Sequence, residues 1–156
     1  MANMNWLELK VPPPVVAALA GAAMWLAAPA DGAGSPAGDW RTAMAVALAL
    51  PGMALEVAGL YAFRRAHTTV NPLRPAGTSA LVTGGVYRIT RNPMYLGLAV
   101  MLLAWAMYLG APLALAGVAA FMGYITRWQI LPEERALARK FGTEFAAYAG
   151  KVRRWL

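Results

Sequence analysis

The sequence predicts an all-α, polytopic membrane protein with about four transmembrane helices, a cytosolic loop and a C-terminal amphipathic helix. Hydrophobic residues make up 60% of the chain and charged residues only 13%. The apolar residues are grouped in long blocks, whereas the core of a soluble protein draws on apolar residues spread along the chain. The length of 156 residues is that of one domain, so residues 1–156 are expected to form a single membrane-embedded unit.

Three apolar blocks account for the four expected spans. They cover residues 11–30, 42–62 and 94–131, and the last block carries no charge before Arg127. That block is too long for one span, and the Gly-Ala-Pro sequence at residues 110–112 divides it, because proline removes a helix donor and clashes with the preceding turn. The third and fourth spans are therefore expected to form a tight hairpin.

An alternative for residues 1–30 is a secretory signal peptide, with the small residues 28–30 (Ala-Pro-Ala) as its cleavage site. The amino end lacks the cluster of basic residues that such peptides carry, which favours a retained first span. The chain has no cysteine and one histidine. Disulfides, thiolate chemistry and a transition-metal site are therefore not expected.

Most of the basic residues behind the net charge of +7 lie on one side of the expected spans. They follow the second and the fourth span, whereas the other side offers only Arg41, close to Asp31 and Asp39. The positive-inside rule then places both termini and the central loop in the cytoplasm. Anionic lipid headgroups explain this charge, and a nucleic-acid partner is not expected. The residues concerned are Arg64, Arg65, Arg74, Arg88, Arg91, Arg127, Arg135, Arg139, Lys140, Lys151, Arg153 and Arg154.

Two segments on the cytoplasmic side have recognisable boundaries. Residues 66–92 form a connection rich in Thr, Pro and Gly, whose length is typical of a functional loop. Asn92 and Pro93 are predicted as the N-cap and the first residue of the third span, with the asparagine accepting from free amides. Pro132 is predicted to start a new helix, which Gly150 frays or ends. An apolar stripe should hold this helix at the membrane surface: Leu137, Phe141, Phe145, Tyr148 and Val152.

Glu133 and Glu134 open that final helix, where the helix dipole favours acidic side chains. Glu133 is expected to point to the polar face, with Lys140 and Glu144. Glu134 falls inside the apolar stripe, where a carboxylate needs a partner. Ligand binding and a buried salt bridge both explain it, because perturbed carboxylates mark both. The bridge would be made to Arg88, Arg91 or Arg127.

Several other residues have both a functional and a structural interpretation. Glu56 lies inside the second span, where a carboxylate is a functional hypothesis by default, but an ion pair or a protonated, hydrogen-bonded acid also explains it. Asn92 and the amides after it can hold an anion or form a simple helix cap. Tyr87 and Tyr95 can be interfacial anchors, and Gly97 a close helix contact.

Taken in order, these pieces resemble the isoprenylcysteine carboxyl methyltransferase and phospholipid methyltransferase superfamily. The pieces are Gly-Val-Tyr-Arg at 85–88, Arg-Asn-Pro-Met-Tyr-Leu-Gly at 91–97, a hydrophobic hairpin, Glu133-Glu134, Phe141-Gly142, Tyr148, and Arg-Arg-Trp at 153–155. The resemblance covers about residues 64–156, which makes that part the expected cofactor-binding and catalytic part. The first two spans carry little of it.

The resemblance implies an integral membrane enzyme of small bacterial type, in the inner membrane, that binds S-adenosylmethionine at the cytosolic face. It implies catalytic roles for Arg91, Glu134 and Arg154. Histidine often stands where this chain has Asn92, so hydrogen bonding by that residue is implied but proton transfer is not. The implied cofactor-binding residues are Tyr87, Arg91, Asn92, Pro93, Tyr95, Gly97, Glu133 and Glu134.

The methyl acceptor is expected to be lipophilic and to enter from the bilayer. It is an isoprenylcysteine-like carboxylate, a phospholipid amine or a thiol; the last two need a base, for which Glu134, Glu56 and His67 are candidates. A nicotinamide-dependent reductase related to sterol reductases and a non-catalytic membrane scaffold are the alternatives. The helix wheel places only Glu134 on the inward stripe, so Glu134 is expected to contribute more to cofactor binding than Glu133.

Overall fold

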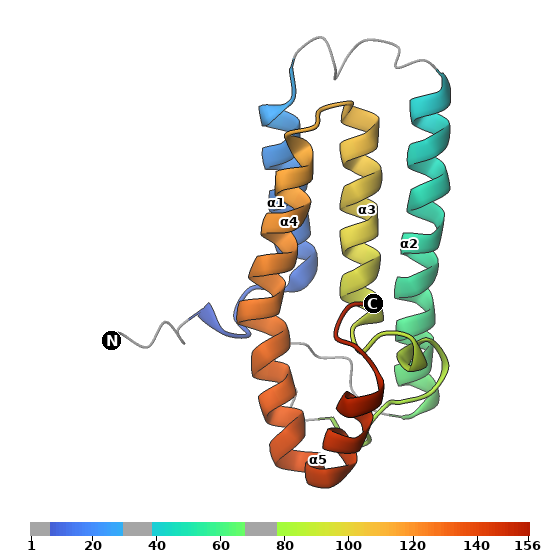
Figure 1. Ribbon diagram of the computed structural model, residues 1–156, viewed down its shortest axis with the longest axis vertical. Helices are drawn as coiled ribbons and strands as arrows, with labels where there is room; N and C mark the ends of the chain where they lie inside the picture. Colours follow the sequence, from blue (N-terminus) through green and yellow to red (C-terminus); the bar gives the residue numbers. More distant parts are fainter. Residues whose placement is uncertain (1–6, 30–38, 68–77) are drawn as a thin grey trace.

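Helices make up all of the regular structure in the residues that the computed structural model describes, which are 7–29, 39–67 and 78–156 (Figure 1). No strand occurs in these ranges, which confirms the predicted all-α class. The elements in chain order are α1 (Pro13–Ala27), α2 (Asp39–Arg65), the 3-10 turn η3 (Gly85–Arg88), α3 (Pro93–Leu109), α4 (Ala114–Ile125), the π-helical η4 (Thr126–Ile130) and α5 (Leu131–Lys151).

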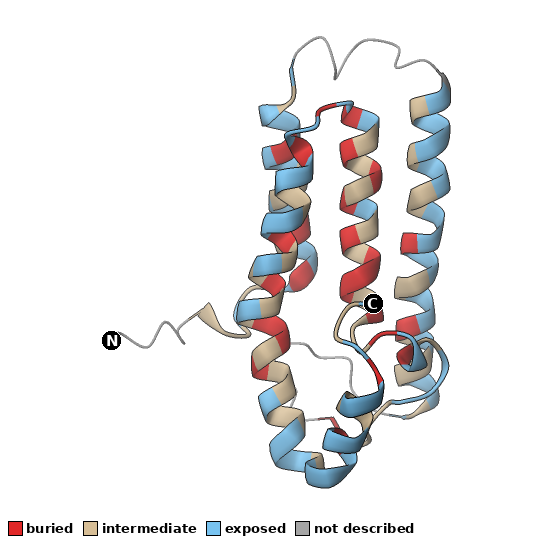
Figure 2. Ribbon diagram, viewed as in Figure 1, coloured by how far each residue is buried: buried red, intermediate tan, exposed pale blue. Residues whose placement is uncertain are grey.

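Helix α3 is the centre of the bundle, because it packs against α1, α2 and α4. Figure 2 shows buried residues along most of α3, whereas α2 exposes most of its surface. Small residues let α2 and α3 approach closely. A Cβ added to Gly97 of α3 would lie 2.6 Å from the carbonyl oxygen of Gly52 in α2. Gly97 is therefore a close helix contact, one of the two interpretations that its sequence position allows.

Helix α2 is the one described helix that is both long and apolar enough to cross a membrane by itself, over Trp40–Arg65. Only 11% of its most apolar window is buried, unlike the core helix of a soluble protein. Helices α1 and α3 are apolar but shorter, with 15 and 17 residues. Large apolar side chains also face outward elsewhere, including Leu26 (77% exposed) and Leu113 (69%). By length and composition, one described helix is long enough for a span, so the predicted four spans are not confirmed.

The hairpin between α3 and α4 forms where the sequence predicts it. Gly110 ends α3 with a left-handed backbone (φ 61°), and its amide donates to the carbonyls of Ala106 and Met107. Glycine adopts this conformation without the steric cost of a Cβ. The guanidinium of Arg41, near the start of α2, lies against Gly110, so a cation sits beside the carboxyl end of α3.

Pro132 does not start a separate helix, contrary to the prediction. The backbone stays helical at Ile130 and Leu131, so α4, η4 and the part of α5 before Gly142 form one continuous rod. Proline has no amide hydrogen for the carbonyl four residues earlier, that of Trp128, and its ring crowds that carbonyl. The wider π turn of η4 accommodates the proline. The Trp128 carbonyl instead accepts from the Leu9 amide at 3.0 Å.

The prediction of one uninterrupted amphipathic helix is also wrong, and its placement at the membrane surface stays a prediction. Figure 1 shows α5 prolonging α4 below the bundle and then turning back toward the start of α3. The chain reverses at Gly142, whose backbone angles (φ 50°, ψ −119°) are non-helical and suit glycine. The predicted stripe is therefore split between two directions, and of its members only Phe145 and Val152 are buried. Gly150 does not end the helix, which continues to Lys151.

Candidate functional site

The C-terminal tail, residues 152–156 after α5, is hydrogen-bonded to residues 90–92, which lead into α3. The amide of Arg91 donates to the carbonyl of Arg153 at 3.0 Å. The side chains of Asn92 and Thr90 both donate to the carbonyl of Arg154, at 2.9 and 3.2 Å. Thr90 is fully buried. These bonds fix the last residues of the chain beside the start of α3, where Figure 1 shows the C-terminus.

Glu134 holds two arginines together within this arrangement. Its Oε1 accepts from Arg91 Nη2 at 2.9 Å and from Arg154 Nε at 3.0 Å, and its Oε2 accepts from Arg154 Nη2 at 2.7 Å. The side chains of Arg91 and Glu134 are only 13% and 18% exposed. The hydrogen bond to Glu134 raises the pKa of Arg154. The buried-salt-bridge interpretation of Glu134 is thus confirmed, with Arg91 as a predicted partner and Arg154 as an additional one; Arg127 pairs with Glu8 instead.

Glu133 points inward, so its predicted position on the polar face is wrong. Its Oε1 accepts from the hydroxyl of Tyr95 at 2.5 Å and from Nε2 of Gln129 at 2.8 Å. Burial raises the pKa of Glu133 to about 7 although these two donors lower it, and the charge of Glu134 raises it further. The carboxyl group of Glu133 therefore changes charge close to neutral pH.

The other residues predicted to bind the cofactor take structural positions around this cluster, which consists of Arg91, Tyr95, Gln129, Glu133, Glu134 and Arg154. Asn92 is the N-cap of α3 and Pro93 its first residue, as predicted, but the asparagine side chain makes no capping bond and reaches the tail instead. The amides of the first turn of α3 therefore receive no cap from Asn92. Tyr87 is buried against Phe63 of α2 at 5.5 Å between ring centroids, and burial raises its pKa. Its carbonyl accepts from the hydroxyl of Tyr148 at 2.8 Å.

Three candidate residues do not join the cluster. Gly97 faces α2, where a Cβ would also lie 2.7 Å from Cγ of Glu56. Among the described residues, Glu56 Oε1 is buried and has no hydrogen-bond partner, so neither the ion pair nor the hydrogen-bonded acid is seen. His67 is exposed in the turn after α2, and its carbonyl accepts from Ser79 at 3.5 Å.

Sequence reasoning missed Gln129 and Thr90. Gln129 precedes Glu133 by four residues, which is the spacing of side-chain contacts along a helix. The pair goes unnoticed when a helix boundary is placed at Pro132. Thr90 has no comparable signal, because its partner lies 64 residues away in the tail.

The cluster combines opposite charges with one unsatisfied polar group. Arg91 Nε is buried and has no hydrogen-bond partner among the described residues. It lies in the same side chain that donates to Glu134 and to the carbonyl of Ala149. Glu133 adds a carboxyl group that accepts only from neutral donors. Such an arrangement can hold a small ligand that carries both an anionic and a cationic group.

The profile of the family described as phospholipid methyltransferase matches residues 40–144, which include α2, the start of α3 and both glutamates. An uncharacterized protein of Haemophilus influenzae is 51% identical over 63 residues, which are 40% of this chain and the whole of that protein. No solved structure matches. The profile match covers more than half of the chain and points to a membrane-associated methyltransferase that acts on lipid. The chain therefore belongs to the phospholipid methyltransferase family.

Proposed function

We propose that this protein transfers a methyl group from S-adenosylmethionine to a lipophilic acceptor at the cytosolic face of the bacterial inner membrane. One observation carries the proposal. Three segments that are far apart in sequence, namely the start of α3 with the residues just before it, the start of α5 and the C-terminal tail, meet in one hydrogen-bonded cluster. A scaffold role would not require this convergence.

The residues of the cluster fit the charged groups of the donor, whose sulfonium and ammonium are positive and whose carboxylate is negative. Glu133 complements positive charge, because its ionised form is a carboxylate in a partly buried position. Arg91 Nε and the first-turn amides of α3 suit the donor's carboxylate. Glu134 keeps Arg91 and Arg154 in place, so it acts as a positioning residue in this proposal.

Methyl transfer needs alignment of the reacting atoms more than proton transfer. A dry site also favours the transfer. The described residues exclude water, because Tyr87, Tyr95, Leu96 and Thr90 are all buried. An amine or thiol acceptor also needs a base. Glu133 is better suited than Glu134, because both oxygens of Glu134 already bind arginines. Asn92 uses its amide to hold the tail, which agrees with hydrogen bonding rather than proton transfer.

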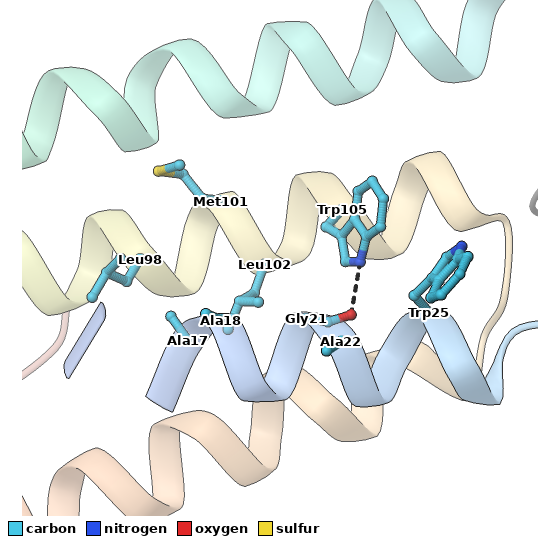
Figure 3. A pocket seen from close by; sticks show the side chains of 9 residues that line it. All are labelled: Ala17, Ala18, Gly21, Ala22, Trp25, Leu98, Met101, Leu102 and Trp105. Atoms are coloured by element: carbon cyan, nitrogen blue, oxygen red, sulfur yellow. Dashed lines mark hydrogen bonds between the residues drawn. The ribbon is translucent and has the colours of Figure 1, made fainter. Parts of the chain in front are cut away.

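An apolar cavity supports a lipophilic acceptor. It has a volume of about 490 Å³ and lies between α1 and α3 (Figure 3). Small residues of α1, including Ala18 and Gly21, face Leu98 and Leu102 of α3, which leaves room for a hydrocarbon chain. Leu98 follows Tyr95 of the cluster by one helical turn. Trp105 also lines the cavity and donates to the carbonyl of Gly21 at 3.0 Å.

The proposed membrane arrangement has four spans and cytoplasmic termini. Helices α1 and α3 extend roughly 22 and 26 Å, and α4 with η4 together a similar length, which is shorter than the ~30 Å of a hydrocarbon core; a bilayer thins locally around short spans. The described basic residues support the orientation. Arg64, Arg65 and the arginines of the cluster lie at one end of the bundle, whereas Arg41 lies at the other, beside the α3–α4 turn.

Calorimetric titration of the full chain in detergent tests the proposal. S-adenosylmethionine should bind, and NADPH should not. Glu133→Gln should weaken S-adenosylmethionine binding by roughly tenfold, the loss expected for one charge-assisted contact. Glu144→Gln is the matched control, because Glu144 is an exposed glutamate of the same helix outside the cluster.

Incubation with labelled donor and a bacterial lipid extract then identifies the acceptor class by the labelled product. Heat from NADPH but not from S-adenosylmethionine would replace the proposal with the reductase alternative.

A further inference from the structure

A second charged site lies on another face of the α4–α5 rod. It is a cavity of about 500 Å³ between the N-terminal segment and the junction of η4 and α5. Arg127, Arg135 and Arg139 line it, and Arg127, Leu131, Arg135 and Arg139 recur every four residues, so they share one helix face. None of these residues belongs to the cluster around Glu134.

The cavity already contains one carboxylate, and it carries excess positive charge. Glu8 Oε1 lies 3.1 Å from Arg127 Nη1, and Glu8 Oε2 lies 2.5 Å from Arg135 Nη2. Burial opposes ionisation of Glu8, but the hydrogen bonds from both arginines hold its pKa below the usual value. Arg139 has no ion-pair partner in the described part of the chain. Three arginines and one glutamate leave a formal charge of +3 − 1 = +2.

The wall that carries Glu8 is held in place by the backbone. Leu9 adopts a left-handed conformation (φ 57°), and its amide donates to the Trp128 carbonyl that Pro132 leaves free. The amide of Lys10 donates to the carbonyl of Leu7 and closes a tight turn. The site therefore joins two segments, and its arginines stand at the surface, with the side chains of Arg127 and Arg135 44% and 47% exposed.

We propose that this cavity binds one phosphate group, held by Arg127, Arg135 and Arg139. Guanidinium groups bind phosphate oxygens through paired hydrogen bonds, and the excess of positive charge matches a mono- or diester. Glu8 occupies the position of an anion between two of the arginines and competes with the phosphate. The headgroup of an anionic phospholipid and a soluble phosphate ester share this chemistry.

The lipid source fits the surroundings better. Leu9 and Leu131 also line the cavity, so the arginines stand beside apolar side chains that suit the start of an acyl chain. The cavity directly follows the apolar α4, where anionic headgroups attract basic residues in the proposed orientation. The site is separate from methyl transfer, and binding there does not depend on that activity.

Binding measurements on the full chain in detergent test this site. Dioctanoyl phosphatidylglycerol is titrated in one arm and glycerol 3-phosphate in the other. Arg139→Gln and Arg135→Gln should each weaken binding about tenfold, whereas Arg139→Lys should restore only part of it, because lysine keeps the charge but not the paired hydrogen bonds. Lys151→Gln removes an equal charge from an exposed residue outside the cavity and should bind like wild type. Glu8→Gln should bind more tightly, because the competing carboxylate is gone.

The two titrations distinguish a phospholipid headgroup from a soluble phosphate ester as the source of the phosphate. Preference for the lipid assigns the site to a membrane phospholipid, and equal binding of glycerol 3-phosphate assigns it to a soluble ester. Equal affinities for wild type, Arg135→Gln and Arg139→Gln, with unchanged unfolding midpoints, would overturn the proposal. So would binding that Lys151→Gln weakens as much as Arg139→Gln, because the attraction would then be general.

Discussion

Glu133 and Glu134 are neighbours in sequence but meet different partners. Both oxygens of Glu134 bind guanidinium groups of Arg91 and Arg154. Glu133 meets only neutral donors, from Tyr95 and Gln129, so its charge is not balanced within the cluster. The expectation that Glu134 contributes more to cofactor binding rested on Glu133 facing outward. With both residues inward, Glu133 is the carboxylate available to a positively charged ligand.

The affinity for S-adenosylmethionine should therefore depend on pH through Glu133. Burial raises the pKa of Glu133 to about 7, so the group is mostly neutral below that pH and charged above it. A positively charged ligand binds the carboxylate form, so the affinity should rise as the pH increases through 7. Calorimetric titrations from about pH 6 to about pH 8 measure this dependence. Glu133→Gln should remove it and leave only the titration of the ligand itself.

The carboxyl group of Glu133 should also make the stability of the fold depend on pH, with stability falling where the affinity rises. Because its folded pKa is raised above the ordinary value of 4.5, the folded state holds a proton that the unfolded state loses. The contribution of this proton to the free energy of unfolding is fully present below pH 4.5 and is lost as the pH rises toward about 7. Thermal unfolding midpoints of wild type should fall across this window more than those of Glu133→Gln. Identical pH profiles for the two proteins would contradict the role of Glu133.

At the scale of elements, the reversal of α5 at Gly142 brings the tail to the site. Its backbone angles are unfavourable for any residue with a Cβ, although a Cβ there would meet no atom within 4 Å. Gly142→Ala should therefore cost about 1–3 kcal/mol through backbone strain alone. Relief of that strain straightens the helix and moves Arg154 away from Glu134. We expect a lower unfolding midpoint and weaker binding of S-adenosylmethionine.

Gly150→Ala is the matched control for this change. Gly150 also has open space around it, but it lies in a regular part of α5. Alanine there should raise stability by about 0.5–1 kcal/mol, because glycine is a poor helix former. The same unfolding midpoint and affinity for Gly142→Ala and wild type would show that the reversal is not needed for the site.

At the scale of the whole molecule, the separation of charge between the two ends predicts the orientation in the membrane. Single cysteines report it cleanly, because the chain has none of its own. Pro112 is exposed in the α3–α4 turn, and Ser79 is exposed near η3 at the other end. A membrane-impermeant maleimide should label Pro112→Cys in intact cells and Ser79→Cys only after permeabilisation. The reverse pattern would invert the proposed orientation and move the cluster out of the cytoplasm.

The sequence by itself determined the features that depend on local chemistry. Blocks of apolar residues specify the helical class, Gly110 and Pro112 specify the hairpin, and Asn92 with Pro93 specifies the start of α3. Each depends on a few neighbouring residues with strong backbone preferences. The order of motifs along the chain was enough to identify the family.

Only the tertiary structure decided which side chains meet. A helix wheel assumes one axis and a constant period, but the π turn before Pro132 changes the period and Gly142 changes the axis. The wheel therefore misplaced Glu133 and grouped residues that point in different directions. The pairing of Glu134 with Arg154 depends on the return of the tail, because a contact across a chain reversal leaves no periodic trace in the sequence.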